Sequence, residues 1–359
     1  MTKVTIFGAG ITGMSIAYLL PKSHSITIVA RNLPGDPTST TSTTTPSSSS
    51  PKKEEGREAE EGEWASPYAC AGWVALGGSE REQRMQLDAL TFLRKLAASH
   101  PESSVRVTEL TDVYDGAVGV RSGEEVWYSG RVPCFEVVER PPGGDGGPGV
   151  EVRYGSAVLN PVVFLPWLRA RLEAQGVKFQ RVGTVKALGE LAGLGHDVLI
   201  NASGAASLTL EDVRDEKVIM DRTYTVLVKS EYRGMFVRRG AAEYTYVFGR
   251  QDGTAVVGGI SEPLDKERRS PEEVRENLLR RAHANLPESF PSGNPEDYSV
   301  VQDLVGIRPL RIPNVRVEKD VINGQKVIHA YGTTMGGYIF SFGLAREAAR
   351  LLDEYVFTA

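Results

Sequence analysis

The chain of 359 residues has few of the side chains that cross-link small proteins or bind metals. It contains two cysteines, Cys70 and Cys134, and five histidines. Two cysteines cannot form a disulfide framework, and no Cys/His spacing in the sequence suits a metal ion. Because free cysteine is among the most buried residue types, both thiols are expected to be small buried side chains. The sequence therefore predicts a protein with no metal site.

Long apolar runs and an excess of basic charge are also missing. No stretch approaches the ~18 consecutive apolar residues of a membrane-spanning helix. The net charge of −5 gives no basic field that would attract nucleic acid or an anionic membrane. Residues 3–7 resemble a strand and not the start of a signal peptide. We therefore expect an intracellular protein that binds neither nucleic acid nor membrane.

Apolar patterns of both kinds alternate along the chain, which indicates an α/β fold. Strands are predicted at 4–7, 26–29, 177–182, 198–200, 223–228, 243–249, 254–259 and 326–331. Helices are predicted at 14–20, 81–99, 160–175, 271–285 and 341–354, the fourth with Ser270 as its N-cap. A Gly/Pro turn is predicted at 141–149. Residues 34–62 are rich in Ser, Thr and Pro and then in charge, and they predict a disordered surface insertion.

The first chemical signal is a glycine motif between the first predicted strand and helix. Gly8, Gly10 and Gly13 have the spacing of the dinucleotide fingerprint. The first glycine makes the tight turn, the second lets the backbone approach a pyrophosphate, and the third lets helix pack on strand. The helix N-terminus adds N–H groups and a partial positive charge. This context predicts nucleotide binding.

The identity of the nucleotide stays open at this point. The fingerprint usually precedes an acidic ribose ligand by about 20 residues, but the second strand ends in Ala30-Arg31-Asn32. Arg31 could indicate NADP, since arginine can accept a 2′-phosphate. A second Gly-rich element near the C-terminus instead suggests a flavin enzyme whose last segment returns to the first domain. An FAD-dependent monooxygenase or an NAD(P)-dependent dehydrogenase could share the first 30 residues.

Five motifs, in the same order, resemble those of the fungal D-amino-acid oxidases. Residues 29–36 resemble a family segment with a similar Ala-Arg-Asp-Leu-Pro-Gly-Asp. This family accepts the missing ribose carboxylate, so the resemblance removes the argument for NADP. Residues 65–73 resemble Ala-Ser-Pro-Trp-Ala-Gly-Ala-Asn-Trp, with Gly72 replacing the Asn. Residues 201–204, 306–311 and 331–338 resemble the family's Asn-x-Thr-Gly turn, its Gly-x-Arg-Pro-x-Arg segment and its closing flavin loop. The resemblance covers nearly the whole chain outside residues 34–62.

The resemblance implies a non-covalently bound FAD and two interleaved domains. A Rossmann-like FAD-binding domain would comprise 1–80, 150–210 and 300–359, and a strand-rich substrate-binding domain 81–149 and 211–299. The residues implied in FAD binding are Gly8, Gly10, Ile11, Thr12, Gly13, Ala30, Arg31, Asn32, Ala71, Gly72, Trp73, Val182, Ser203, Gly204, Arg308, Gly332, Met335, Gly336, Gly337, Tyr338 and Ile339.

The resemblance also implies the chemistry. Arg308 would bind the substrate carboxylate bidentately, which Lys cannot do. Tyr246 would meet the same carboxylate, and the main-chain carbonyl of Met335 would hold the amine. A hydride would pass from the substrate Cα to flavin N5, and dioxygen would reoxidise the flavin. The products would be a 2-oxo acid, ammonia and hydrogen peroxide.

Two positions bear on which D-amino acid is preferred. Residues 229–240 fall on the family's active-site lid, and Phe-Val-Arg there resembles the Phe-Ile-Arg of D-aspartate oxidases. Arg238, or Arg239 with a different gap placement, would then serve an acidic side chain. Ser261 argues the other way, because D-aspartate oxidases typically have Arg at this position. We expect a preference for acidic substrates, with neutral D-amino acids as the alternative.

Assembly and location are expected only from the family. Its members are often dimers or tetramers, so a homo-oligomer is expected. They are mostly peroxisomal through a C-terminal Ser-Lys-Leu-like signal. This chain ends in Phe357-Thr358-Ala359, which leaves a peroxisomal or a cytoplasmic location open.

Overall fold

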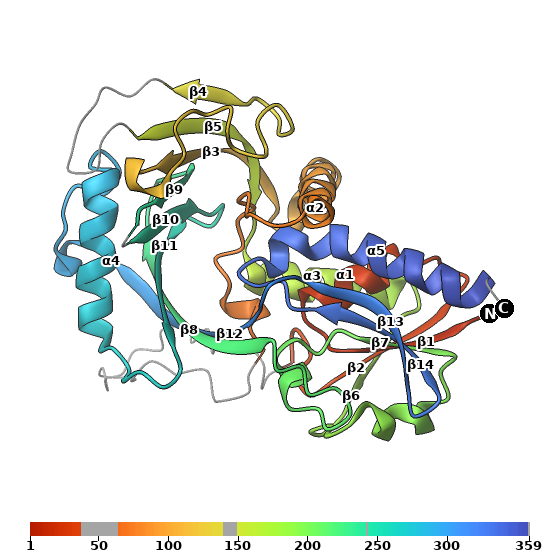
Figure 1. Ribbon diagram of the computed structural model, residues 1–359. Helices are drawn as coiled ribbons and strands as arrows, with labels where there is room; N and C mark the ends of the chain where they lie inside the picture. Colours follow the sequence, from red (N-terminus) through yellow and green to blue (C-terminus); the bar gives the residue numbers. More distant parts are fainter. Residues whose placement is uncertain (37–63, 139–148, 242, 358–359) are drawn as a thin grey trace.

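The computed structural model describes residues 1–36, 64–138, 149–241 and 243–357. In these ranges the chain forms two sheets side by side, each covered by helices (Figure 1). None of the helices in the described ranges is long and apolar enough to span a membrane. The predicted insertion lies outside the described residues from position 37 on, and so does the predicted turn at 141–148.

The first sheet is a six-stranded nucleotide-binding type, with strand order β13-β14-β7-β1-β2-β6. Its central strands pair in parallel, and β13 runs antiparallel to β14 at the edge. The strands are β1 (Lys3–Phe7), β2 (Ser25–Ala30), β6 (Lys178–Arg181), β7 (Val198–Asn201), β13 (Arg316–Ile322) and β14 (Gln325–Tyr331).

Helices cover one face of this sheet because alternate residues of its strands, such as Val4 and Ile6, point there. The covering helices are α1 (Ile11–Leu19), α3 (Pro161–Ala174) and α5 (Gly337–Phe357). Helix α2 (Glu80–Ser99) packs on the outer side of α5. The other face is covered by the 3-10 helix η4 (Leu188–Leu194), whose Leu188 and Leu191 contact Phe7.

The second sheet has eight mostly antiparallel strands in the order β12-β8-β11-β10-β9-β3-β5-β4. Helix α4 (Pro271–Asn285) packs on one face, and the other face turns toward the first sheet (Figure 1). The strands are β3 (Arg106–Tyr114), β4 (Glu136–Val138), β5 (Val150–Val158), β8 (Val218–Lys229), β9 (Met235–Arg239), β10 (Tyr244–Gly249), β11 (Thr254–Pro263) and β12 (Val300–Arg311). Short 3-10 helices complete the fold: η1 (Ser66–Tyr68), η2 (Pro101–Ser103), η3 (Gly116–Val118), η5 (Gly204–Leu208) and η6 (Pro295–Asp297).

The predicted N-cap of α4 is confirmed. The Ser270 hydroxyl caps α4 by accepting a hydrogen bond from the Glu273 N–H at 3.2 Å, and the Glu273 carboxylate accepts one from the Ser270 N–H at 3.1 Å. This reciprocal capping box satisfies two of the N–H groups that every helix start exposes.

Other predictions need correction. Helices α1 and α5 begin at Ile11 and Gly337, several residues before the predicted starts, because Gly13 and the loop at 331–338 had been assigned to turns. Bounds had not been predicted for strands β3, β4, β5, β9, β12 and β13. Strands β5 and β12 lie in the second sheet, although 150–210 and 300–359 were assigned to the FAD-binding domain. The domain division itself stays a prediction.

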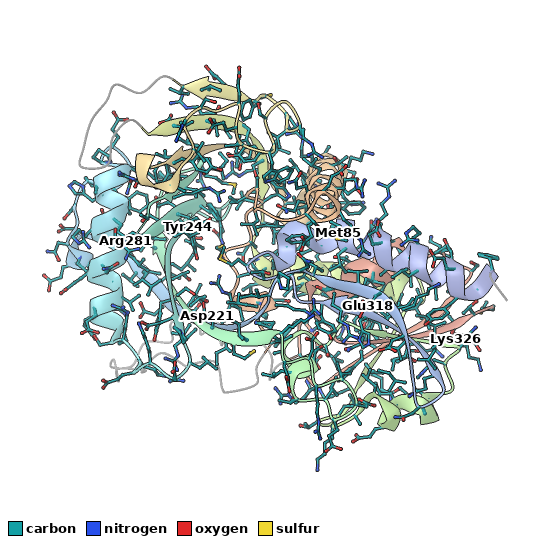
Figure 2. The ribbon with its side chains drawn as sticks, viewed as in Figure 1. Met85, Asp221, Tyr244, Arg281, Glu318 and Lys326 are labelled. Atoms are coloured by element: carbon teal, nitrogen blue, oxygen red, sulfur yellow. The ribbon has the colours of Figure 1, made fainter. Side chains whose placement is uncertain are left out.

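The contact between α2 and α5 depends on Gly343. A Cβ atom at this position would lie 1.8 Å from the backbone oxygen of Met85. Met85 is labelled in Figure 2. We predict that Gly343→Ala lowers the thermal unfolding midpoint by about 5 °C, since the steric clash exceeds the gain of about 1 kcal/mol in helix propensity. Gly193→Ala, where a Cβ meets open space, should leave the midpoint unchanged or raise it. Equal midpoints for both variants would contradict the proposed contact.

Candidate active site

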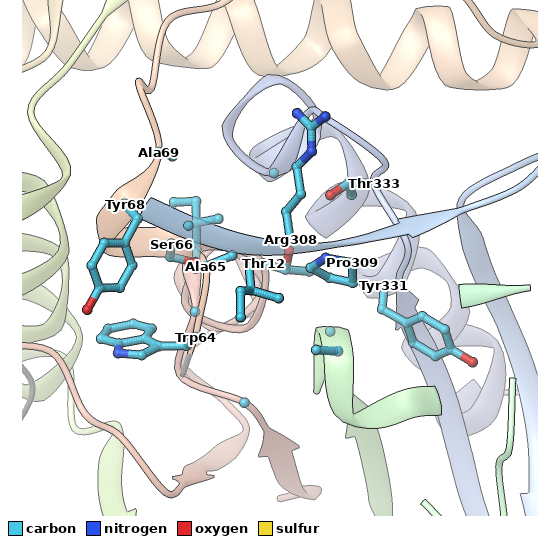
Figure 3. A pocket seen from close by; sticks show the side chains of 18 of the residues that line it. Thr12, Trp64, Ala65, Ser66, Tyr68, Ala69, Arg308, Pro309, Tyr331 and Thr333 are labelled. Carbon is cyan, nitrogen blue, oxygen red and sulfur yellow. The ribbon is translucent and has the colours of Figure 1, made fainter. Parts of the chain in front are cut away.

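A cavity of about 530 Å³ lies between the two sheets. It extends from the C-terminal ends of β1 and β7 to the inner face of the second sheet, and residues 64–72 and 330–339 line its sides. Figure 3 shows some of the lining side chains, with Arg308 projecting from β12. The cavity therefore joins the nucleotide motif to the strands of the second sheet.

The glycine motif forms a turn in which the backbone segments touch. Gly8 has φ +119°, and a Cβ atom there would lie 2.3 Å from the carbonyl oxygen of Ala202. A Cβ at Gly13 would lie 2.0 Å from the Gly8 oxygen. Gly8 and Gly10 line the cavity, whereas Gly13 serves the packing of α1 on β1. These contacts agree with the turn role predicted for Gly8 and the packing role predicted for Gly13, and the pyrophosphate role of Gly10 stays a prediction.

Two helices point their N-termini at the cavity. Ile11 and Thr12 begin α1 at one end of it, and Gly337, Tyr338 and Ile339 begin α5 on its side. The first N–H groups of a helix have no partners within the helix, and the helix dipole places partial positive charge there. Both helix starts therefore favour anionic groups in the cavity.

Ser66 connects three parts of the cavity wall. Its hydroxyl accepts a hydrogen bond from the Ile11 N–H at 3.1 Å, and its carbonyl accepts one from the Tyr338 hydroxyl at 2.9 Å. The motif at 65–73 is thereby fixed to the starts of α1 and α5. Trp73, at the end of this motif, is fully buried, and its indole N–H donates to the Gln86 carbonyl at 2.8 Å.

Gly72 replaces the Asn of the motif that residues 65–73 resemble, and the replacement has a structural reason in this chain. A Cβ atom at Gly72 would lie 2.4 Å from the Met235 Cε and 2.7 Å from a Phe248 ring carbon. Met235 and Phe248 come from neighbouring strands, β9 and β10, and are register partners. These two side chains occupy the space that the family's Asn side chain would need.

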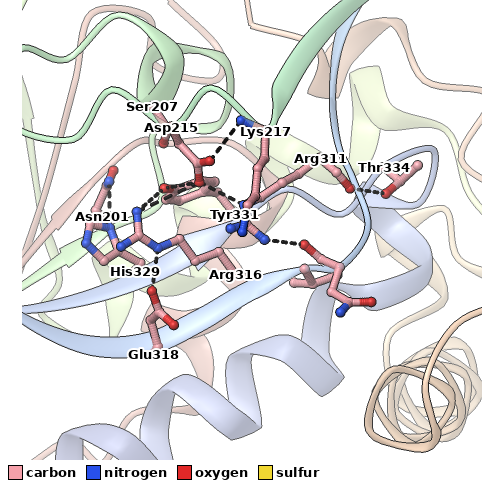
Figure 4. A network of polar contacts seen from close by, with 12 residues as sticks. Asn201, Ser207, Asp215, Lys217, Arg311, Arg316, Glu318, His329, Tyr331 and Thr334 are labelled. Carbon is pink, nitrogen blue, oxygen red and sulfur yellow. Dashed lines mark hydrogen bonds and ion pairs between the residues drawn. The ribbon is translucent and has the colours of Figure 1, made fainter.

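A network of polar contacts lies behind the loop that follows β14 (Figure 4). The Asp215 carboxylate accepts hydrogen bonds from Arg311 Nε at 2.7 Å and from the Tyr331 hydroxyl at 2.8 Å. Burial acts to raise the pKa of Asp215, but these two donors hold it below its ordinary value. Burial raises the pKa of Tyr331 to about 12. Arg311 therefore has a structural role, and a Cβ at Gly332 would clash with it at 2.6 Å.

A second chain of contacts fixes the turn at Ser203. The Ser203 N–H donates to the Asn201 side-chain oxygen at 3.2 Å, and the Asn201 amide contacts His329 Nδ1 at 3.1 Å. His329 Nε2 lies 3.3 Å from an Asp320 carboxylate oxygen. Burial lowers the pKa of the fully buried His329. Ser203 and Gly204, which line the cavity, are thus held from behind.

The inner face of the second sheet supplies the other end of the cavity. Tyr244, Tyr246 and Phe248 of β10 line it, because alternate residues of a strand share a face. The Tyr246 ring lies on Gly258 and Gly259 of β11, where added Cβ atoms would come within 2.2 and 2.6 Å of it. The two glycines therefore make room for the tyrosine ring.

Arg308 is held at one side and has an unused donor on another. Its Nη2 donates to Ser261 Oγ at 2.8 Å and lies 3.3 Å from an Asp221 carboxylate oxygen. Its Nε is buried and has no hydrogen-bond partner among the described residues. Arg308 lines the cavity and its side chain is 23% exposed. The guanidinium is therefore positioned by protein groups while still able to donate to a ligand.

The two cysteines differ from the expectation that both are buried. Cys134 is exposed, and Cys70 is partly buried in the cavity wall. Burial raises the pKa of the Cys70 thiol, and the neighbouring Tyr246 hydroxyl acts in the opposite direction. Cys70 therefore brings a neutral thiol next to Tyr246.

Arg238 and Arg239 both belong to β9 inside the second sheet, and their predicted role toward an acidic side chain stays a prediction. Arg238 points away from the cavity, toward Asp115 at 2.8 Å and Asn285 of α4 at 3.1 Å. Arg239 lies on the cavity side, where its Nε and Nη2 donate to the two oxygens of Asp112 at 2.8 and 3.0 Å.

Asp112 is fully buried and also accepts a hydrogen bond from the Tyr128 hydroxyl at 2.8 Å. Arg239 is the register partner of Tyr244, which lines the cavity. Burial raises the pKa of Tyr244 to about 12, and the positive charge of Arg239 opposes this shift. Arg239 is thus an ion-paired residue directly behind the cavity wall.

Most predicted site residues meet at the cavity. The lining includes Gly8, Gly10, Ile11, Thr12, Ala30, Arg31, Asn32, Ala71, Gly72, Ser203, Gly204, Tyr246, Arg308, Gly332, Met335, Gly337, Tyr338 and Ile339. The lining does not include Gly13, Trp73, Val182, Gly336, Arg238 or Arg239, although residues 183–185 next to Val182 do line it. Lining residues that the sequence analysis missed include Trp64, Leu76, Thr223, Thr225, Tyr244, Phe248, Thr333 and Thr334. Strand alternation from Tyr246 could have found Tyr244 and Phe248.

The cavity fits FAD. The glycine cradle at Gly8 and Gly10, with the start of α1, suits a pyrophosphate. The start of α5 offers N–H groups to a second polar part, and apolar side chains such as Leu76 and Ile339 can face a flat ring. Fold and site together define a dinucleotide-dependent enzyme whose cavity is closed on one side by a mostly antiparallel sheet.

The comparison with protein families agrees. Residues 3–351 match the family model DAO, described as FAD dependent oxidoreductase, and the chain belongs to this family. The chain is 30% identical to a D-aspartate oxidase of Talaromyces thermophilus, over 98% of this chain and 95% of the relative. It is 26% identical to a D-amino-acid oxidase of Fusarium vanettenii, over 98% and 96%. The predicted family and its cofactor FAD are confirmed.

Solved structures show the same fold at low sequence identity. Glycine oxidase from Geobacillus kaustophilus superposes with a TM-score of 0.68 at 16% identity, covering 99% of this chain and 95% of the other. L-amino acid deaminase from Proteus myxofaciens gives a TM-score of 0.69 at 13% identity, covering 100% and 90%. The predicted fold class is confirmed.

The contact between Gly72 and Met235 can be tested by a double-mutant cycle. We predict that Gly72→Asn weakens FAD binding and lowers the free energy of unfolding, because the new side chain clashes with Met235. Met235→Ala makes room, so the double variant should be more stable than the two single losses together imply, by about 1–3 kcal/mol. FAD titration and urea unfolding measure both effects. Strict additivity would contradict the explanation.

The buried ion pair gives a second prediction. Arg239→Met leaves the Asp112 charge buried without its arginine and should lower the free energy of unfolding by about 3–5 kcal/mol. Adding Asp112→Asn should recover much of that loss. Arg238→Met, at a side chain that is 42% exposed, should cost under about 1 kcal/mol. Urea unfolding of the three FAD-loaded variants checks this order, and equal losses at 238 and 239 would refute it.

Proposed function

We propose that this protein oxidises D-amino acids with FAD, with a preference for acidic substrates. The observation that carries the proposal is Arg308, whose buried Nε lacks a partner in the described chain while it lines the cavity. A buried donor without a partner is unfavourable, so a ligand with acceptor oxygens would stabilise it. A substrate carboxylate is such a ligand, and arginine binds carboxylates in a planar, bidentate manner.

Tyr246 supports the same assignment. Its ring lies over Gly258 and Gly259 of β11, the strand that separates β10 from β8, and β8 in turn adjoins β12. Burial raises its pKa well above the ordinary value, which keeps the hydroxyl protonated as a donor. Arg308 and Tyr246 would together fix the carboxylate, and the Met335 carbonyl in the loop before α5 would hold the amine.

Bound FAD would accept the hydride from the substrate Cα, and dioxygen would reoxidise it to give hydrogen peroxide, while the imino acid hydrolyses to a 2-oxo acid and ammonia. The chain's own groups would bind the substrate and orient it toward the cofactor. The N-terminus of α5 favours negative charge on the cofactor beside it. No acid or base side chain is assigned to the step.

Two features support the acidic preference. The relative at 30% identity is named D-aspartate oxidase. Arg239 lies directly behind Tyr244, and two of its three nitrogens are bonded to Asp112 or Ala75, which leaves Nη1. If the Tyr244 side chain moved aside, Arg239 Nη1 would be available to the side-chain carboxylate of an acidic substrate.

A preference for neutral D-amino acids is the second candidate, and it has its own observation. Asp112 already pairs with Arg239, and Asp221 already pairs with Arg308. These carboxylates reduce the positive electrostatic potential that a substrate with two carboxylates would meet in the cavity. Ser261 stands where an additional arginine would be expected for acidic substrates.

Reduction of the flavin by the substrate, measured under anaerobic conditions, separates these alternatives. The FAD-loaded protein is mixed with D-aspartate and, separately, with D-alanine, and the visible absorption of the oxidised flavin is followed. Faster bleaching by D-aspartate at equal concentration supports the acidic preference. Faster bleaching by D-alanine supports the oxidase activity, contradicts the acidic preference and assigns Arg239 a structural role. If neither substrate nor a panel of other D-amino acids bleaches the flavin, the proposed function is wrong.

The carboxylate site predicts the effect of two substitutions. Arg308→Lys should lower kcat/KM for every D-amino acid by about a hundredfold, because the bidentate geometry is lost. Tyr246→Phe should lower it by about tenfold through the loss of one hydrogen bond. Arg346→Lys, at a surface arginine that pairs with Asp88, is the matched control and should keep the parent value. An Arg308→Lys enzyme with unchanged kcat/KM would exclude Arg308 from the site.

The assembly and the location follow the family resemblance in this proposal: a homo-oligomer in the peroxisome or the cytoplasm.

A further inference from the structure

Two buried polar atoms without a partner point to the same cavity. Across the described residues, the cavity-lining side chains with such an atom are Arg308, through Nε, and Thr225, through Oγ1. Thr225 is 5% exposed. The first atom belongs to the proposed carboxylate site, while nothing so far gives the Thr225 hydroxyl a role. A buried hydroxyl without a hydrogen bond is unfavourable, so this atom indicates a ligand group beside it.

The order of the strands places β8, which carries Thr225, between the strand of Arg308 and the strand of Tyr246. Arg308 is on β12 and Tyr246 on β10, and β8 and β11 lie between them in the order β12-β8-β11-β10. The Tyr246 ring covers Gly258 and Gly259 of β11, at the irregularity opposite Thr225 on β8. Arg308 pairs with Asp221 on β8, but its guanidinium reaches Ser261, the register partner of Thr223, and so extends along β8 toward Thr225. With strands about 4.8 Å apart, a group between this guanidinium and the Tyr246 hydroxyl lies over β8.

On β8, the cavity-facing hydroxyls are those of Thr223 and Thr225. The Thr223 hydroxyl already donates to the Gly306 carbonyl at 3.1 Å. The Thr225 hydroxyl is not used in this way. Its neighbours on the same face, Leu227 and the paired Leu304, are apolar and offer it no alternative.

We propose that the Thr225 hydroxyl is a third hydrogen-bond donor to the substrate carboxylate, alongside Arg308 and Tyr246. This inference rests on the proposed function. The ligand group is the α-carboxylate because it is the group that joins Arg308 to Tyr246 and so lies over β8. Thr225 therefore contributes to binding every D-amino acid equally, whatever its side chain.

The test uses the FAD-loaded full chain and two ligands that lack the amine and cannot be oxidised. Propionate and succinate correspond to deaminated alanine and aspartate, and their binding is followed through the visible spectrum of the bound flavin. Thr225→Val keeps the shape but removes the hydroxyl, and it should weaken both ligands by about tenfold. KM for D-alanine and D-aspartate should rise by a similar factor, with a smaller change in kcat.

Matched variants separate a lost hydrogen bond from a packing effect. Thr225→Ser retains the hydroxyl and should bind both carboxylates within about threefold of the parent chain. Thr245→Val makes the same change on β10 at a residue whose side chain points to the opposite face, and it should bind both as the parent does. FAD content and the thermal midpoint are measured for each variant, and Thr225→Ala replaces Thr225→Val if the latter loses FAD.

The outcomes are distinct. A loss with succinate and D-aspartate but not with propionate and D-alanine would assign the hydroxyl to the substrate side chain and overturn the proposal. Unchanged affinity in Thr225→Val, or an equal loss in Thr225→Ser, would overturn it as well. If the parent protein is not reduced by any D-amino acid, the proposed function fails first. If it is reduced and only the Thr225 effect is missing, this inference alone fails.

Discussion

The close approach of Gly8 to the Ala202 carbonyl is the constraint on which the cofactor end of the cavity depends. The approach is possible because Gly8 has no Cβ and adopts a positive φ. It joins the ends of β1 and β7, and so it sets the turn that begins α1 and the wall that contains Ser203. The Asp320-His329-Asn201 contacts hold that wall from the opposite side. Side chains thus complete a geometry that the backbone contact defines.

The substrate end depends on a different kind of contact, between the motif at 65–73 and the second sheet. Gly72 lies against Met235 and Phe248, and Cys70 lies beside Tyr246. The segment that lines the cofactor side therefore also packs on the strands that carry the proposed substrate residues. A change of side-chain volume on β9 or β10 would be transmitted to the cofactor through Gly72. This contact links substrate preference to cofactor binding in one layer of side chains.

The sequence predicted the cofactor end well because its signals are local. Gly8, Gly10 and Gly13 lie within six residues, and their roles follow from backbone sterics alone. The capping box at Ser270 is local in the same sense. The starts of α1 and α5 were placed too late because Gly13 and the loop at 331–338 were assigned to turns, whereas Gly13 lies inside α1 and Gly337 begins α5. Function requires those residues there, since the N–H groups must approach a ligand.

The substrate end could be predicted only in part, because it is built by strand pairing between distant segments. Arg308 was found through its motif, but its neighbours Asp221 and Ser261 come from two other strands. The position of Arg238 and Arg239 turned on a single residue of register, since a shift by one reverses the face of every side chain in a strand. Sequence could not decide between them, and pairing in the sheet places Arg239 on the cavity side. Thr225 has no motif at all, and its unpaired hydroxyl is visible only once the strands are ordered.

The parallel pairing of β3 with β9 has a consequence for how this protein is made. Asp112 and Arg239 meet across that pairing although 127 residues separate them in the chain. Until β9 has left the ribosome, β3 can pair with β5 but lacks its parallel neighbour, and Asp112 lacks its counter-charge. Strand β12, which carries Arg308, is added later still and closes the edge of the sheet. Long-range pairing of this kind is slow compared with local folding. The first sheet's β1-α1-β2 unit can therefore fold early, while catalytic competence appears only when nearly the whole polypeptide has been synthesised.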